Sequence, residues 1–285
     1  MLYLINDHKC GFNLTNKIVE IANKIQYTKL HEHINYECFL DNHNYFDKSY
    51  KIRYLVRKLL KKNPKIIPKA IYRRFCYLFW NEWHEHDKYI LIIRDPREIV
   101  ISGYLYHKKC NELWAINKSY SYYYFWDKYH FKKSNLIKNK KYIDFSKKIS
   151  IDQNYKSQLN NLNEEDGILH ELNNISFLTL SGLNNYDFYN KKNIIIIRFE
   201  DLIFNFKKTL EKILNFSEIN DVNKSKIYNE VNKYNLFDNK DGIKFHENFI
   251  TNYNLDLNRY KNYFTKRINN EFNNNYKGLL RLLKY

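Results

Sequence analysis

The sequence predicts an α/β protein built around a mostly parallel central sheet. Three short apolar runs carry this prediction, at residues 2–5, 90–93 and 194–197. They are rich in leucine and isoleucine, which suits parallel strands buried on both faces. Each run is followed by a segment with helical periodicity. Strands that alternate with helices in this way are typical of parallel βαβ units.

The remaining elements follow from the same patterns. The helices after the three strands are predicted at about 13–25, from 96 or 97 onward, and at about 205–216. We expect further helices at 49–62, 111–150, 164–185 and 266–285, a fourth strand at about 34–40, and loops with short helices in the Asn-rich stretch 217–258. Since no repeat or clear linker interrupts the chain, residues 1–285 are predicted to form one domain.

The amino-acid composition limits the classes of protein that this sequence can encode. The chain has 285 residues, of which 44% are hydrophobic, so it can bury a large core. The net charge of +17 favours anionic ligands, although an AT-rich genome would also enrich lysine. The four cysteines show no CxxC spacing, which argues against a zinc or redox motif. The N-terminal apolar run is too short for a signal peptide, and no run reaches the ~18 residues of a membrane span, so we expect a cytoplasmic protein.

The loop after the first strand has the features of an anion site. It reads Asp-His-Lys-Cys-Gly-Phe-Asn-Leu over residues 7–14. Ligands bind at the carboxyl ends of strands in open α/β sheets, and the N–H groups that open a helix can hold phosphate oxygens. Gly11 permits a close backbone approach, and Lys9 adds a mobile positive charge. The P-loop pattern GxxxxGK[ST] is absent.

A second anion-binding layout follows the second strand. Arg94 ends that strand, and Ser102 stands eight residues later in the next helix, followed by Gly103. The planar guanidinium is suited to bidentate phosphate recognition. The alternative is that Arg94 caps the sheet in a structural ion pair with an acidic residue such as Asp95.

These two motifs resemble those of sulfotransferases that use 3′-phosphoadenylyl sulfate (PAPS), in particular soluble bacterial ones. Residues 90–107 are similar to the family's 3′-phosphate motif, with Arg94 and Ser102 at the matching separation. Residues 8–14 resemble its 5′-phosphosulfate loop, Pro-Lys-Ser-Gly-Thr-Thr-Trp, in which Lys9 and Gly11 match and the other side chains differ. Residues 164–172, 194–216 and 259–265 resemble later segments, but the family's Arg-Lys-Gly is not evident.

The resemblance implies a three-layer sandwich with the P-loop-NTPase-like sulfotransferase fold and helical insertions. It also implies transfer of a sulfuryl group from PAPS to a hydroxyl or amine, with release of adenosine 3′,5′-bisphosphate and without a metal. Lys9 would stabilise the leaving oxygen as a catalytic residue. The residues expected to bind the cofactor are His8, Lys9, Cys10, Gly11, Phe12, Asn13, Leu14, Arg94, Ser102 and Phe199. Phe199 stands where the family often has a tyrosine near the adenine, and a core position is the alternative.

An acceptor alcohol benefits from a general base, which is usually histidine. His43 is the first candidate because it follows the strand predicted at 34–40. The other candidates are His84, His86, His107 and Asp41. We expect a small-molecule or saccharide acceptor and no nucleic-acid partner.

Three alternatives stay open at this point. A catalytically degenerate sulfotransferase-fold protein would bind the bisphosphate without turnover. A basic nucleotide- or polyanion-binding module would bind DNA or heparin in a salt-sensitive way. A P-loop-like kinase would prefer ATP with Mg²⁺, although its lysine–serine/threonine motif is missing.

Overall fold

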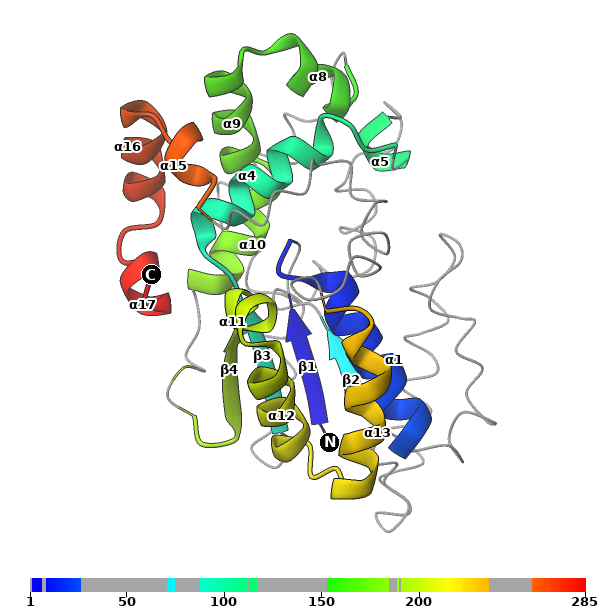
Figure 1. Ribbon diagram of the computed structural model, residues 1–285. Helices are drawn as coiled ribbons and strands as arrows, with labels where there is room; N and C mark the ends of the chain where they lie inside the picture. Colours follow the sequence, from blue (N-terminus) through cyan, green and yellow to red (C-terminus); the bar gives the residue numbers. More distant parts are fainter. Residues whose placement is uncertain are drawn as a thin grey trace, which may run out of the picture.

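The computed structural model describes residues 2–6, 9–26, 71–74, 88–111, 113–116, 153–184, 189, 191–235 and 258–285 (Figure 1). Its centre is a four-stranded parallel sheet with the strand order β2-β1-β3-β4. The strands are β1 (Leu2–Asn6), β2 (Ile71–Arg74), β3 (Lys88–Ile93) and β4 (Ile194–Arg198). The three predicted strands are therefore confirmed, and so is their parallel arrangement.

The structure adds a strand that the sequence analysis missed. Strand β2 pairs with β1 so that Leu2 stands opposite Ile71 and Ile5 opposite Arg74. Its sequence, Ile-Tyr-Arg-Arg, ends in two arginines and has no apolar run. The pattern that marked the other strands is therefore absent. The strand predicted at 34–40 lies outside the described residues.

The sheet is the middle of three layers. Ile90 and Ile92 of β3 belong to one core cluster, while Tyr89, Leu91 and Ile93 belong to another, because successive side chains of a strand point to opposite faces. The first cluster also contains apolar residues of α1 (Phe12–Gln26), α12 (Phe206–Phe216) and α13 (Asp221–Asn232). The second contains residues of α4 (Pro96–His107), α9 (Glu164–Asn173) and α10 (Ile175–Asn184). The predicted α/β class with a parallel sheet is confirmed.

The other described helices are short. They are α5 (Leu113–Ile116), α8 (Tyr155–Asn161), α11 (Phe199–Phe204), α15 (Tyr260–Tyr263), α16 (Lys266–Asn275) and α17 (Leu279–Leu283). The helix predicted at 49–62 and most of 111–150 lie outside the described residues.

Two predicted helices are each divided in the structure. The helix expected over 164–185 is divided at Asn174, whose backbone leaves the helical region. The C-terminal helix is divided before α17 by Gly278, which has a φ of +84°. Helix α13 lies within 217–258, where loops with short helices were expected, and the Asn220 side chain caps it by accepting from the Asn223 N–H.

Helix α4 begins directly at the end of β3. Asp95 caps it, since its Oδ1 accepts from the Arg97 N–H at 2.9 Å, and Pro96 occupies its first turn. Helix α4 therefore starts at the carboxyl edge of the sheet, where a ligand site is expected.

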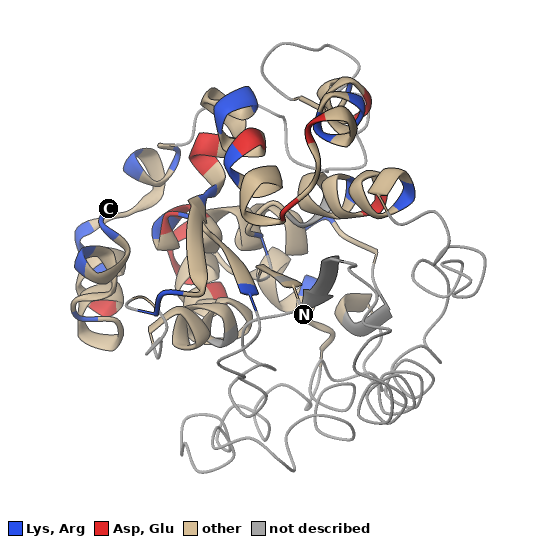
Figure 2. Ribbon diagram, turned by 90° about the horizontal axis from the view of Figure 1, so that it is seen from below, with Lys and Arg blue, Asp and Glu red and all other residues tan. Residues whose placement is uncertain are grey.

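Basic residues are spread over the described helices. Figure 2 shows Lys and Arg on several of the described helices, with acidic residues among them. Among the described residues, no helix is both long and apolar enough to cross a membrane.

Candidate functional site

The loop after β1 has a backbone that favours glycine. Lys9 and Gly11 both lie in the left-handed region, with φ values of +63° and +78°. A Cβ atom on Gly11 would stand 2.4 Å from the Phe199 ring, so only glycine fits. Thr15 holds the loop by donating to the Gly11 carbonyl from its N–H and its hydroxyl, at 3.1 and 2.9 Å. Asn6, at the end of β1, donates in turn to the Thr15 hydroxyl at 3.0 Å. The loop is thus fixed to β1 and α1.

The side chains of this loop divide between the core and the sheet edge. Cys10 and Leu14 are buried, each in one of the two core clusters. Of the positions expected to bind the cofactor, these two can therefore offer only backbone groups. Phe12 begins α1 and Asn13 follows in its first turn. His8 lies outside the described residues.

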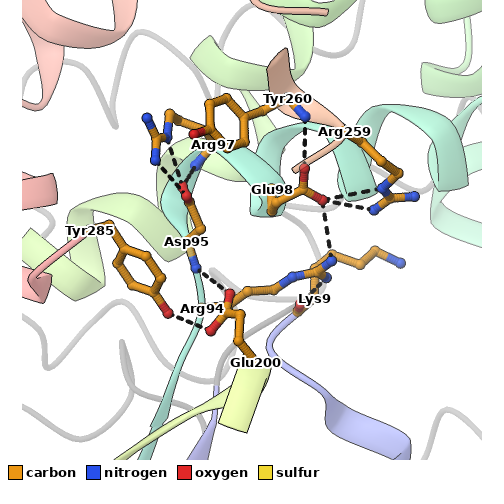
Figure 3. Close-up of polar contacts among 9 residues, drawn as sticks. All are labelled: Lys9, Arg94, Asp95, Arg97, Glu98, Glu200, Arg259, Tyr260 and Tyr285. Carbon is orange, nitrogen blue, oxygen red and sulfur yellow. Dashed lines mark hydrogen bonds and ion pairs between the residues drawn. The ribbon is translucent and has the colours of Figure 1, made fainter. Parts of the chain in front are cut away.

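The structure brings Arg94 and the Lys9 loop together (Figure 3). The Arg94 guanidinium donates from Nη1 to the Lys9 carbonyl at 2.8 Å, and its Nη2 lies 3.5 Å from Oε2 of Glu98. Its Cζ lies 5.0 Å from the centre of the Phe199 ring. The ion pair that was the alternative to anion binding therefore exists, but with Glu98 and not with Asp95. Asp95 pairs with Arg97 instead.

One donor of Arg94 has no partner. Arg94 is 6% exposed, and its Nε is buried without a hydrogen bond in the part of the chain that the structure describes. A buried donor without a partner costs free energy, commonly about 1–3 kcal/mol. An anion oxygen at this edge would satisfy it.

Glu98 joins Arg94 to the C-terminal segment. This carboxylate is fully buried and accepts from Nε and Nη2 of Arg259, at 3.2 and 3.1 Å. It also accepts from the Tyr260 N–H at 2.7 Å. The sequence analysis did not select Arg259, although residues 259–265 resembled a family segment. Since two guanidinium groups share one carboxylate, the group keeps a net positive charge.

A single stripe of α4 faces the loop. Glu98, Ser102 and Tyr106 follow one another at four-residue intervals, so they lie on the same side of the helix. The Lys9 ammonium lies 3.1 Å from the centre of the Tyr106 ring. In Figure 3 the Lys9 side chain extends away from the Arg94 guanidinium. Tyr106 was also missed, although its spacing from Ser102 was available as a signal.

Phe199 lies next to Gly11 and Arg94. Its ring is 7% exposed and belongs to the core cluster that includes α1 and α12. It packs against the positions of Gly11 and Arg94. The structure thus gives Phe199 a core position, which was the alternative to an adenine contact.

The C-terminal residue also makes a polar contact at the carboxyl edge of the sheet. Glu200 accepts from the Asp95 N–H at 3.1 Å and from the Tyr285 hydroxyl at 2.6 Å. Burial and the nearby Glu200 carboxylate raise the pKa of Tyr285, which keeps it a neutral donor. Burial alone would lower the pKa of Arg97, but its hydrogen bond and charge interaction with Asp95 raise it overall.

His107, one of the candidate bases, is held in the core. Its Nδ1 lies 2.8 Å from Oε2 of Glu171, and both side chains are fully buried. Tyr155 and Ser176 also donate to Glu171, each at 2.8 Å. Burial tends to raise the pKa of Glu171, but its polar partners, His107 first, lower it overall. A histidine enclosed in this way is unsuited to deprotonating an acceptor at the loop.

The other candidate bases, His43, His84, His86 and Asp41, lie outside the described residues. Within the described part of the chain, no group of three or more His, Cys, Asp and Glu side chains is arranged to hold a metal.

Comparison with known proteins adds independent information. A family model described as "Sulfotransferase domain" matches residues 4–284. A crystal structure of mouse sulfotransferase SULT7A1 complexed with PAP is similar at 17% sequence identity and a TM-score of 0.41. That match covers 98% of this chain and 83% of the mouse chain. No protein of curated function matches. Because the family model spans nearly the whole sequence, this chain belongs to the sulfotransferase family.

Proposed function

We propose that the protein transfers a sulfuryl group from PAPS to a hydroxyl or amine acceptor and releases adenosine 3′,5′-bisphosphate. One observation carries the proposal: the Arg94 guanidinium is hydrogen-bonded to the Lys9 carbonyl, so the two predicted anion-binding motifs lie at one edge of the sheet. Residues from two strands and one helix thus meet at the place where open α/β sheets bind ligands.

Arg94 and Ser102 are assigned to the 3′-phosphate. The buried Nε of Arg94 supports this assignment, because it is a guanidinium donor that the described residues leave unsatisfied. Ser102 lies on the α4 stripe between Glu98 and Tyr106 and is half-buried. Its hydroxyl can therefore serve the same anion.

The loop after β1 is assigned to the 5′-phosphosulfate. Gly11 keeps the backbone open, and α1 begins at Phe12, so its first N–H groups are donors for phosphate oxygens. Cys10, Phe12, Asn13 and Leu14 are assigned to it through this backbone, and His8 is assigned to it from the sequence motif alone. Phe199 supports the site from below, through its contacts with Gly11 and Arg94.

Lys9 is assigned to catalysis. When the bond between sulfur and the bridging oxygen breaks, negative charge develops on that oxygen, and the Lys9 ammonium would stabilise it. A new bond forms between sulfur and the acceptor oxygen or nitrogen, whose proton passes to a general base. We assign the base to His43. The acceptor is proposed to be a small molecule or saccharide. The protein is proposed to be cytoplasmic, and the reaction to proceed without a metal ion.

Calorimetric titration with adenosine 3′,5′-bisphosphate tests the proposal. We expect the native protein to bind it, Arg94→Ala to lose binding and Lys9→Ala to bind more weakly. Lys208→Ala, an exposed position in α12, is the control and should bind normally. Circular dichroism checks that Arg94→Ala is folded. If the native protein does not bind the bisphosphate, the proposal is wrong.

A degenerate sulfotransferase is the second candidate. The burial of Cys10 and Leu14 favours it, because these positions carry a serine and a tryptophan in the motif that the loop resembles. Bisphosphate binding together with no cleavage of PAPS in a single-turnover experiment would establish this alternative. Preference for ATP with Mg²⁺ would instead indicate a kinase-like protein, and salt-sensitive binding of heparin alone would indicate a polyanion-binding module.

A further inference from the structure

We propose that Tyr106 is the positioning residue for the Lys9 ammonium, which it holds over its ring at the place where the leaving oxygen develops charge. The inference rests on the proposed function, because it assigns a partner to the lysine that the reaction requires. Tyr106 itself touches neither the phosphates nor the sulfur in this proposal and acts through Lys9.

Lys9 and Tyr106 are in direct contact. The Nζ atom of Lys9 lies 3.1 Å from the centre of the Tyr106 ring, well inside the ~6 Å within which a ring face attracts a cation. It is shorter than the distance at Lys207 and Tyr228, where the ammonium lies 5.7 Å from the ring centre. The Lys9 ammonium is therefore seated on the ring.

Both ends of Lys9 are held in place. Its backbone is left-handed, at a φ of +63°, and its carbonyl accepts from Arg94. The ring of Tyr106 receives the far end of the side chain. A free lysine side chain loses up to about 2 kcal/mol of rotamer entropy when it is ordered. This arrangement orders the side chain before the substrate binds, so the reaction step does not bear that cost.

The helix that carries Tyr106 is a rigid support. Tyr106 belongs to α4, which begins at the end of β3 and is capped by Asp95. The neighbouring Tyr104 is buried in the core cluster that includes α9 and α10. Tyr106 lies one turn beyond Ser102, about 6 Å further along the helix axis. The ammonium is thus placed at the far end of the stripe from Glu98 and Arg94.

The chemistry of the contact suits this role. The ring face attracts the cation through its quadrupole and carries no net charge, so this contact does not itself neutralise the Lys9 ammonium. The positive charge held on the ring can therefore act on the developing anion.

The contact can be observed without an assay of activity. Reductive methylation with ¹³C-formaldehyde labels the lysines and keeps their charge, and Lys9→Arg identifies the Lys9 signal. We expect an upfield ring-current shift for that signal, which Tyr106→Phe keeps and Tyr106→Leu removes. A Lys9 signal at the position of an exposed lysine in the native protein would overturn the inference.

Cleavage of PAPS in the presence of 2-naphthol tests the consequence. Tyr106→Leu should lower kcat about tenfold or more, with a smaller change in the KM for PAPS, and Tyr106→Phe should restore most of kcat. Tyr228→Leu, which removes the ring near Lys207, is the control and should match the native protein.

A double-mutant cycle separates positioning from a direct or structural role. In a Lys9→Ala background, Tyr106→Leu should cause no further loss, because the group that it positions is gone. An equal loss in both backgrounds, or an unchanged kcat in an active Tyr106→Leu enzyme, would refute the inference. A wrong proposed function would be recognised by a different result, because the native protein would then neither bind the bisphosphate nor cleave PAPS.

Discussion

Arg94 donates a hydrogen bond from Nη1 to the main-chain carbonyl of Lys9 across 2.8 Å. This bond joins the end of β3 to the loop after β1, so the side chain expected to bind the 3′-phosphate also shapes the loop expected to bind the 5′-phosphate. The guanidinium is therefore structural, and if it also binds the 3′-phosphate as proposed, changes at Arg94 should affect both stability and ligand binding.

We expect Arg94→Lys to separate charge from geometry. Lysine keeps the positive charge but lacks the fork that reaches the Lys9 carbonyl and Glu98 together. A hydrogen bond to a charged group contributes about 1.5–3 kcal/mol, so the free energy of unfolding in urea should fall by about that amount. An unchanged urea midpoint would mean that charge alone holds the loop.

Gly11→Ala should destabilise the protein by more than about 1 kcal/mol. The position combines a positive φ with a Cβ site 2.4 Å from the Phe199 ring. Gly278→Ala is the matched control, because Gly278 also has a positive φ but has open space around its Cβ site. Thermal unfolding of the two variants gives the cost of the contact by difference. Gly11→Ala with Phe199→Leu should recover that difference, and equal losses in the two single variants would contradict the argument.

Glu98→Gln should be among the most damaging changes at this edge. It removes the only formal negative charge in the group formed by Glu98, Arg94 and Arg259. Breaking a buried charged pair on one side typically costs about 3–5 kcal/mol. Sodium sulfate should restore more of the melting temperature in this variant than in the native protein, since an anion can replace the carboxylate.

The exposed pair of Glu230 and Lys233 supplies the comparison for Glu98. Glu230→Gln should leave the melting temperature nearly unchanged, because surface ion pairs contribute little. If the two variants responded equally to sulfate, the effect at Glu98 would be general salt stabilisation and not binding at the arginines.

The buried Glu171 predicts how stability depends on pH. Its pKa is lowered in the folded protein, so its contribution is fully present above the ordinary glutamate pKa and is lost as the pH falls through the folded value. We expect the difference in unfolding free energy between the native protein and Glu171→Gln to be constant near neutral pH. It should shrink below about pH 4.5. Urea titrations at several pH values measure it, and a difference that grew in acid would reverse the assignment.

Tyr285→Phe tests the attachment of the C-terminus. The variant loses the hydroxyl that donates to Glu200, and Glu200 also accepts from the Asp95 N–H at the start of α4. The lost hydrogen bond to a carboxylate should cost about 1.5–3 kcal/mol of unfolding free energy. Tyr285→Leu should cost more, because it also removes the ring that lies 4.8 Å from the Arg198 guanidinium. Equal losses would show that only the hydroxyl matters.

The parts of the fold that the sequence predicted are those with strong local signals. Strands β1, β3 and β4 are continuous apolar runs, and α4 starts with a capping Asp95 followed by Pro96. Strand β2 was not predicted, because its residues carry no such signal; among the described strands it pairs with β1 alone. The division of the 164–185 helix at Asn174 was also not predicted, because the apolar periodicity of the sequence continues past Asn174.

At the candidate site, too, the residues with a local sequence signal were predicted and the others were not. Residue type and spacing within the two motifs indicated anion binding, and this selected Arg94, Ser102, Lys9 and Gly11. Glu98, Arg259 and Tyr106 were not, because each takes part through a partner that is distant in the sequence: Glu98 meets Arg259, and Tyr106 meets Lys9. A single sequence does not show which distant side chains meet.

By itself, the sequence determined the α/β class and the parallel strands and predicted two anion-binding motifs, because strand burial, helix capping and motif spacing are local properties of the chain. Only the tertiary structure decided that Arg94 closes onto the Lys9 carbonyl, that Glu98 is shared by two arginines, and that the Lys9 ammonium rests on Tyr106. These contacts depend on how β1, β3, α4 and the C-terminal segment pack against one another. That packing is set by burial of the two core clusters and not by any local pattern.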